Sequence, residues 1–245
     1  MVLNVQLFSL KQENIPDYIA FREKVIKRYS DSYNNFGCNY IGLYKPFRPE
    51  RFNISEVYLW KTNTAEEAQN ISASLPEVPD EIQKIEIESA KFKDDAQDSL
   101  NLWVEPITLT LNSRKLLSID GKMLRICNFE PAPDKTTEHL IEFENRISDT
   151  YTSHLNIIDW NYMGTFKTIG LNKKLWAEVE FVKGSTPEEA IQKEKEHGET
   201  PETLKIIEEC RTFISKRNKD EMVWLLPLIL SDYAKKGIML GEVND

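Results

Sequence analysis

The chain is poor in the residue types that build metal sites and disulfide frameworks. It has only three cysteines and three histidines among 245 residues. Cys38, Cys127 and Cys210 lie far apart, are odd in number and form no C-x-x-C motif, so neither a disulfide framework nor a zinc knuckle is expected. No two histidines have H-x-x-x-H spacing, and there is no Walker loop, G-x-G-x-x-G or G-x-S-x-G. The sequence therefore predicts no metal and implies no cofactor.

Basic charge and long apolar runs are also lacking. The formal net charge is −9, which argues against nucleic acid or an anionic membrane as a partner. The longest apolar run, 224–230, is far too short to cross a bilayer. The first residues have no basic start followed by an apolar block and a small-residue cleavage site. We therefore expect a cytoplasmic protein with no membrane partner.

What the chain does contain is an internal repeat, because a shift of 122 positions aligns its two halves without a gap over a long central stretch. The first matches are Asn39, Tyr40, Gly42 and Lys45 with Asn161, Tyr162, Gly164 and Lys167. Further matches are Glu56 and Val57 with Glu178 and Val179, and Thr64, Glu66, Glu67 and Ala68 with Thr186, Glu188, Glu189 and Ala190. The paired glycines predict a bulge or a close backbone approach.

The pattern of each half predicts the order β-α-β-β-α-β, a ferredoxin-like unit. In the first half we expect strands at 3–8, 39–45, 55–61 and 100–110, with helices at 15–36, from 64 and at 81–92. In the second half we expect strands at 123–129, 161–168, 175–182 and 221–230, with helices at 135–154, 187–197 and 201–216. Thr64 and Thr186 each precede a glutamate by three residues, a capping box that predicts a helix start.

This duplicated element order resembles the dimeric α/β-barrel superfamily, which includes antibiotic-biosynthesis monooxygenases and NIPSNAP-like proteins. The resemblance implies an α+β fold in which two tandem ferredoxin-like units, 1–111 and 122–232, pack sheet to sheet within one chain, followed by a tail at 233–245. It also implies a site between sheet and helices or inside the barrel, and pairing into a homodimer.

Strand alternation places side chains on two faces. We expect Val57 and Leu59, with Val179 and Phe181, to face the helices, and Glu56, Tyr58 and Trp60 to share the opposite face with Trp176, Glu178 and Glu180. A carboxyl among aromatic groups has a raised pKa, which suits a general acid or base. Glu56 and Glu178 are therefore catalytic candidates. The competing interpretation is that the glutamates form structural ion pairs. His154, near the end of a helix in the second half, is a third candidate as a base, and its competing interpretation is an exposed helix-end histidine.

The ligand-binding candidates are the aromatic and acidic side chains near these carboxyls: Tyr58, Trp60, Tyr40, Tyr162, Glu180 and Trp176. Haem-degrading relatives combine an Asn, a Trp and an axial His; Asn4 and Trp60 resemble the first two, but no histidine follows Trp60 on the next helix. Two functions stay open. One is a cofactor-independent oxygenase, cyclase or isomerase that acts on a small, partly apolar molecule; the other is a non-catalytic binding or stress-related protein with a filled barrel.

Overall fold

The computed structural model describes residues 1–47, 51–73, 80–93, 99–170, 175–198 and 200–241. The first half contains β1 (Val2–Phe8), a short 3-10 turn (Gln12–Asn14), α1 (Ile15–Asn34), β2 (Cys38–Pro46), β3 (Ile54–Trp60), α2 (Ala65–Ala73), α3 (Asp80–Ala90) and β4 (Leu100–Pro106). The second half contains β5 (Lys122–Pro131), α4 (Thr137–Ile157), β6 (Trp160–Ile169), β7 (Leu175–Lys183), α5 (Pro187–Lys193) with a π turn (Glu194–Gly198), α6 (Pro201–Arg211) and β8 (Ile214–Leu230). A last helix, α7 (Asp232–Lys236), follows.

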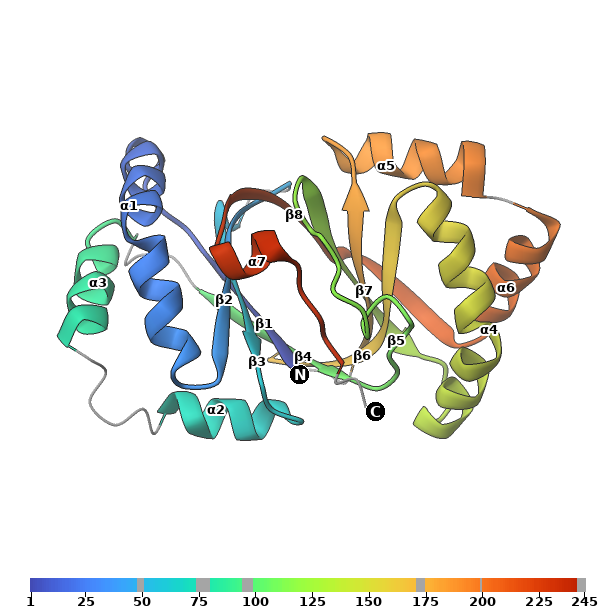
Figure 1. Ribbon diagram of the computed structural model, residues 1–245. Helices are drawn as coiled ribbons and strands as arrows, with labels where there is room; N and C mark the ends of the chain where they lie inside the picture. Colours follow the sequence, from blue (N-terminus) through green and yellow to red (C-terminus); the bar gives the residue numbers. More distant parts are fainter. Residues whose placement is uncertain (48–50, 74–79, 94–98, 171–174, 199, 242–245) are drawn as a thin grey trace.

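The eight strands form one closed antiparallel barrel in the order β1-β3-β2-β8-β5-β7-β6-β4 (Figure 1). Two seams join the halves. At one, β2 pairs with β8, from Gly42 opposite Leu230 to Pro46 opposite Leu225. At the other, β4 pairs with β6, and Lys167 forms an ion pair of 2.8 Å with Glu105 across the seam. The first-half helices and the second-half helices cover opposite sides of this barrel (Figure 1). The α+β barrel architecture predicted from the sequence is therefore confirmed.

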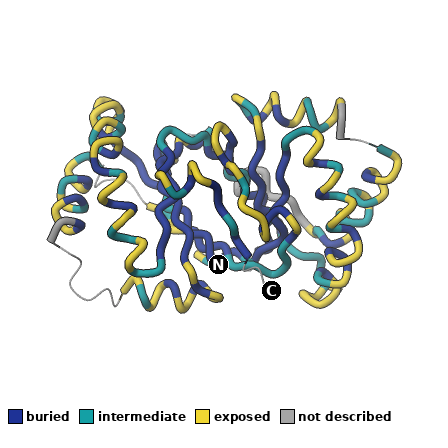
Figure 2. The backbone as a smooth tube through the Cα atoms, in the orientation of Figure 1, coloured by how far each residue is buried: buried dark blue, intermediate teal, exposed yellow. Residues whose placement is uncertain are grey.

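Apolar side chains from all eight strands pack together in the barrel interior. They include Leu3, Val5, Ile41, Val57, Leu59, Leu102, Leu124, Ile126, Met163, Val179, Phe181 and Leu225. The backbone around them is almost continuously buried (Figure 2). The expected facing of Val57, Leu59, Val179 and Phe181 toward the helices is therefore wrong, because these four point inward. A closed barrel covered by helices buries both faces of its strands, so alternation alone does not identify the inner face.

Each half has a β-bulge at its glycine, as the sequence predicted. The pairing register shifts between Tyr40 and Gly42 in the first half and between Tyr162 and Gly164 in the second. A side chain at Gly42 would clash with the backbone of Ile229, and one at Gly164 would clash with Thr108. The glycines therefore allow the chain of the other strand or linker to come close at the seams.

Both predicted helix starts are confirmed, and each has the threonine hydrogen bond of a capping box. The Glu67 amide donates to Thr64 Oγ1 at 3.2 Å, and the Glu189 amide donates to Thr186 Oγ1 at 3.1 Å. In both halves the glutamate carboxylate accepts the amide of the residue before the threonine. The two helices, α2 and α5, thus begin with the same hydrogen bonds.

The end of the second half differs from the expectation. The predicted helix 201–216 ends at Arg211, and β8 begins at Ile214 rather than near 221. The apolar spacing continues past the helix end, but Phe213 packs against the Phe143 ring and Ile214 pairs with Pro131 of β5. Sheet pairing thus overrides the helical period there. The tail contributes α7, and its last residues, 242–245, lie outside the described part. Within the described residues no helix is long and apolar enough to span a membrane.

Candidate functional site

Two buried polar clusters lie between the barrel wall and the helices, one in each half. In the first, Glu56 of β3 lies 2.7 Å from the Arg22 guanidinium of α1, and each residue is at most 2% exposed. Tyr18 and Tyr58 donate hydrogen bonds to the two Glu56 oxygens at 2.9 and 2.8 Å. The carboxylate is therefore fully satisfied, as a buried charge requires.

Further tyrosines enclose this ion pair. The Arg22 guanidinium lies 4.5 Å from the Tyr29 ring centre, and the Tyr29 and Tyr58 hydroxyls are 3.0 Å apart. Tyr40 packs edge-on against the Tyr29 and Tyr58 rings, and its hydroxyl has no partner among the described residues. Burial, and next the charge of Glu56, raise the pKa of Tyr29, Tyr40 and Tyr58 well above the ordinary value, so these phenols stay protonated.

The second cluster centres on Glu144 of α4, which occupies the position of Arg22 in the 122-residue alignment. Its Oε1 accepts hydrogen bonds from Tyr162 at 2.9 Å and Thr165 at 3.0 Å. Its Oε2 is buried and has no partner among the described residues. Burial raises the pKa of Glu144 to about 7, with Glu178 adding to the shift, while the two hydroxyls oppose it. Near neutral pH this carboxyl can therefore both accept and release a proton.

An ion pair and a third carboxyl complete the second cluster. Arg125 of β5 pairs with Glu180 of β7, and its guanidinium lies 5.5 Å from the Trp160 ring and 5.4 Å from the Trp224 ring. Burial raises the pKa of Glu180, although Arg125 opposes this. Glu178 is half-buried, and its Oε1 lies 3.9 Å from the Cys210 sulfur. The cluster therefore holds three carboxyl groups and one cation.

The candidates named from the sequence are divided between these clusters and their apolar surroundings. Tyr58 and Tyr40 lie in the first cluster, and Tyr162, Glu178 and Glu180 in the second, so Glu56 and Glu178 are not brought together. The aromatic remainder is packed in apolar contacts: Trp60 against Trp103, with ring centres 6.0 Å apart, and Trp176 edge-on against Phe129 at 6.1 Å. His154 lies on α4, and its Nε2 has no partner among the described residues.

Asn4 and Trp60 do not fit a haem-holding set. The Asn4 amide donates to the Leu102 carbonyl at 3.2 Å and to the Asn101 side chain, and it is 1% exposed. Trp60 is 3% exposed within the apolar layer below α2 and α3. His154 belongs to the other half of the molecule. In the described part of the chain, no group of three or more His, Cys, Asp or Glu residues is placed to hold a metal ion either.

The sequence interpretation missed Arg22, Glu144 and Arg125. A signal for two of them was available. Tyr18, Arg22, Val25 and Tyr29 recur at helical spacing, so Arg22 stands on the apolar stripe of its helix, where an ion needs a partner. Its counterpart in the second half is an acid, which marks the same buried position as chemically different in the two halves.

Comparisons with known proteins show the fold and not the activity. No family model matches the chain, and no curated protein matches it. Among solved structures, two proteins described as putative monooxygenases are similar. The one from Lactobacillus acidophilus has a TM-score of 0.60 at 14% identity, with 98% of this chain and 99% of that chain covered. The one from Fusobacterium nucleatum has a TM-score of 0.54 at 14% identity, with 98% and 97% covered. An anthrone oxidase-like protein has a TM-score of 0.51 at 8% identity, with 97% and 95% covered. The chain thus has the dimeric α/β-barrel fold of these proteins.

Proposed function

We propose that the protein is an enzyme of the cofactor-independent oxygenase, cyclase or isomerase type, with its proton-transfer site in the second half. The single observation that carries this proposal is Glu144: a buried carboxyl with a pKa near 7, one oxygen held by two hydroxyls and the other oxygen without a partner. A base held in this way is oriented by Tyr162 and Thr165, and no other described group competes for a proton at Oε2.

The chemistry begins with proton transfer. Oε2 of Glu144 takes a proton from an activated C–H or O–H group, and the carboxylic acid returns it to another atom of the substrate in an isomerase or cyclase. In an oxygenase, O2 is the second substrate: an activated methylene becomes a carbonyl with one oxygen atom, and the other oxygen leaves as water with the two hydrogens. Tyr162 stays a neutral phenol, because burial and Glu144 raise its pKa well above the ordinary value.

The surroundings favour a small, partly apolar substrate. Phe143, Trp176 and Phe213 form an apolar layer between α4, α6 and the barrel wall. Glu178 and Cys210 are half-buried, and they mark the side from which a molecule would reach the second cluster. We place proton transfer on Glu144, with Glu178 and Glu180 as neighbouring acids, rather than on Glu56, whose charge Arg22 neutralises.

The experiment is a turnover screen with paired variants. Anthrone-type methylene compounds and 1,3-dicarbonyl compounds are assayed for O2 uptake and for exchange of C–H protons with deuterated water. Glu144→Gln keeps the size but removes the base, and we expect a loss of about 10²- to 10⁴-fold in rate. Glu142→Gln, on the exposed face of the same helix, is the control and should keep the rate. Equal rates in the two variants would exclude Glu144 as the base.

One observation favours the second function, a non-catalytic binding protein. Apolar side chains from every strand pack together in one core cluster, as a filled barrel requires. If no compound in the screen shows turnover or exchange with the wild-type protein, this alternative gains support.

We also propose that the halves 1–111 and 122–232 are ferredoxin-like units that arose by duplication. In support, their strands follow the same relative order, β4-β1-β3-β2 and β8-β5-β7-β6. Expression of 1–111 alone tests this proposal, because an autonomous unit should fold, and its exposed strand edges should drive it to dimerise.

A further inference from the structure

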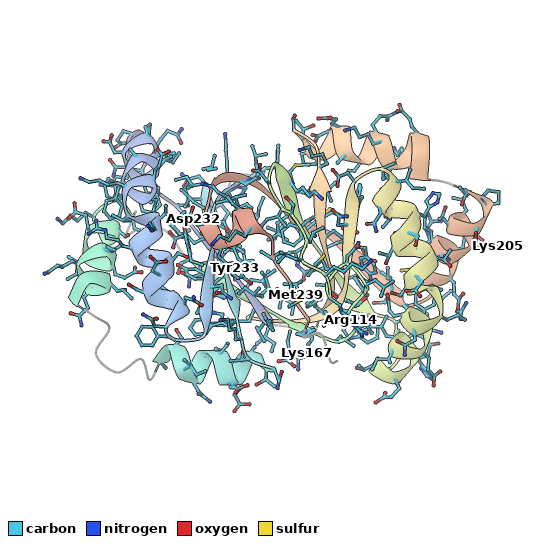
Figure 3. The ribbon with its side chains drawn as sticks, viewed as in Figure 1. Arg114, Lys167, Lys205, Asp232, Tyr233 and Met239 are labelled. Carbon is cyan, nitrogen blue, oxygen red and sulfur yellow. The ribbon has the colours of Figure 1, made fainter. Side chains whose placement is uncertain are left out.

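A polar cleft lies in the first half, lined by residues that belong to neither carboxyl cluster. It has a volume of about 380 Å³ between α1, the start of β2 and α7. Its lining includes Lys27, Asp31, Asn39, Asp232, Tyr233 and Lys236. Asp232 and Tyr233 lie on the short α7 helix (Figure 3). The volume is within the range of small-molecule sites.

The segment after β8, which carries α7, is held against the first half in the same way as the segment after β4 is held against the second half. Ser231 Oγ donates to the Tyr40 carbonyl at 2.6 Å, and Thr110 Oγ1 donates to the Tyr162 carbonyl at 2.7 Å. Two residues further along each segment stand Tyr233 and Asn112. The cleft and the space beside Asn112 are therefore equivalent places in the two halves.

In the second half this place is filled by hydrogen-bonded side chains. Asn112 and Asn156 exchange two hydrogen bonds, of 2.9 and 3.1 Å, between their side-chain amides. Asn161 donates to Asn156 at 2.9 Å and accepts from Lys122 at 2.5 Å. The asparagine at the start of β6 is thus satisfied by protein groups.

Its counterpart at the start of β2 is not satisfied. Asn39 is 2% exposed, and its Nδ2 has no partner among the described residues. Tyr233 stands where the second half has Asn112. Asn34, which aligns with Asn156, accepts a hydrogen bond from Lys61 Nζ at 3.2 Å instead of one from Asn39. A buried amide without an acceptor is costly, so a water or a ligand group that supplies an acceptor would stabilise this site.

The charged groups of the cleft indicate the charges of the ligand that would supply this acceptor. Lys27 and Lys236 supply two cations, and Asp31 and Asp232 supply two anions. None of these four forms an ion pair with another described residue. A carboxylate suits the Asn39 amide and the lysines, and an ammonium group suits the aspartates.

We propose that this cleft binds a small zwitterion with a carboxylate and an ammonium group, of the size of an α-amino acid or a dipeptide. The carboxylate accepts from Asn39 Nδ2 and lies near Lys27 or Lys236, and the ammonium group lies near Asp31 or Asp232. The site is separate from Glu144 and does not depend on the proposed enzymatic function.

Calorimetric titration of the full chain with the standard L-amino acids and with diglycine tests the proposal. We expect saturable binding of at least one zwitterion and loss of that binding when its carboxylate is amidated or its amine is acetylated. Asn39→Asp replaces the donor by an anion and should weaken binding about tenfold or more. Lys236→Gln and Asp232→Asn are at exposed positions where a substitution should not disturb folding. Each should weaken binding severalfold.

Lys235→Gln is the matched control, because Lys235 is an exposed neighbour on α7 that does not line the cleft. It should bind like the wild type. The proposal is overturned if no probe binds up to about 20 mM. It is also overturned if binding is unchanged in Lys236→Gln and Asp232→Asn, or if the amidated and acetylated probes bind as well as the zwitterion.

Discussion

The two halves hold buried charge in opposite ways. In the first half, the helix residue at the centre of the polar cluster is Arg22, and it neutralises Glu56. In the second half, the matching residue is Glu144, so the cluster has an acid where its counterpart has a cation. Arg125, on the neighbouring strand β5, pairs with Glu180 of β7 and compensates one of the carboxyl groups of this cluster. One architecture thus supports a closed ion pair in one half and a surplus of carboxyl groups in the other. The surplus includes Glu144, whose raised pKa of about 7 lets it exchange protons near neutral pH.

The largest effect is expected from removing the cation of the first half. Arg22→Met leaves Glu56 buried without its partner and should lower the free energy of unfolding by about 3–5 kcal/mol in urea denaturation. Adding Glu56→Gln in the same chain should recover much of that loss, because no buried charge is then left. Lys24→Met, at an exposed position of the same helix, should change stability little. A small effect of Arg22→Met would mean that the two halves do not differ as described.

Glu144→Gln should change how the stability of the protein depends on pH. The folded pKa of Glu144 is raised to about 7, above its value of about 4.5 in the unfolded chain, so the folded state binds the extra proton between these values. The protonated Glu144 carboxyl therefore stabilises the folded protein below about pH 4.5. This stabilisation is lost as the pH rises toward 7, and the free energy of unfolding falls by up to about 3 kcal/mol. The glutamine variant should lack this decline in urea unfolding measured from pH 4.5 to 8. If the stability of the variant still falls over this pH range as in the wild type, a group other than Glu144 binds the proton.

The two equivalent tyrosines sharpen the comparison further. Tyr162 donates to Glu144, whereas the Tyr40 hydroxyl has no partner among the described residues. Tyr162→Phe should cost about 1 kcal/mol and raise the pKa of Glu144 further, which carbon-13 NMR of the carboxyl can follow. Tyr40→Phe should be neutral or slightly stabilising, because it removes an unsatisfied polar group. Equal costs would contradict the difference between the two clusters.

The smallest effects are expected where the halves agree. Thr64→Ala and Thr186→Ala remove the same cap hydrogen bond from α2 and α5, and each should cost about 1 kcal/mol in thermal or urea unfolding. Serine at either position keeps the oxygen and should restore most of the loss. A large difference between the two alanine variants would show that the repeated sequence has unequal local roles.

The fold was predictable from the sequence because local signals and the repeat agree. Alternation, capping boxes and the paired glycines indicated the elements and the bulges, and the resemblance of the repeated element order to dimeric α/β barrels implied the barrel. The facing of the strands was not predictable by the same means. Val57 and Glu56 alternate correctly, but both sides of the wall are buried, and only ring closure decides which side is inner. Glu144 was missed because its partners, Tyr162 and Thr165, come from another element, and helical spacing says nothing about them.

Closure of the ring has a further consequence for how the protein behaves beside other polypeptides. A solitary four-stranded sheet from the first half would end in β2 and β4, with rows of free amide and carbonyl groups that can recruit a foreign strand. Here β8 and β6 occupy those rows along the described pairing. Each half thereby shields the strand edges of the other from the addition of a foreign strand.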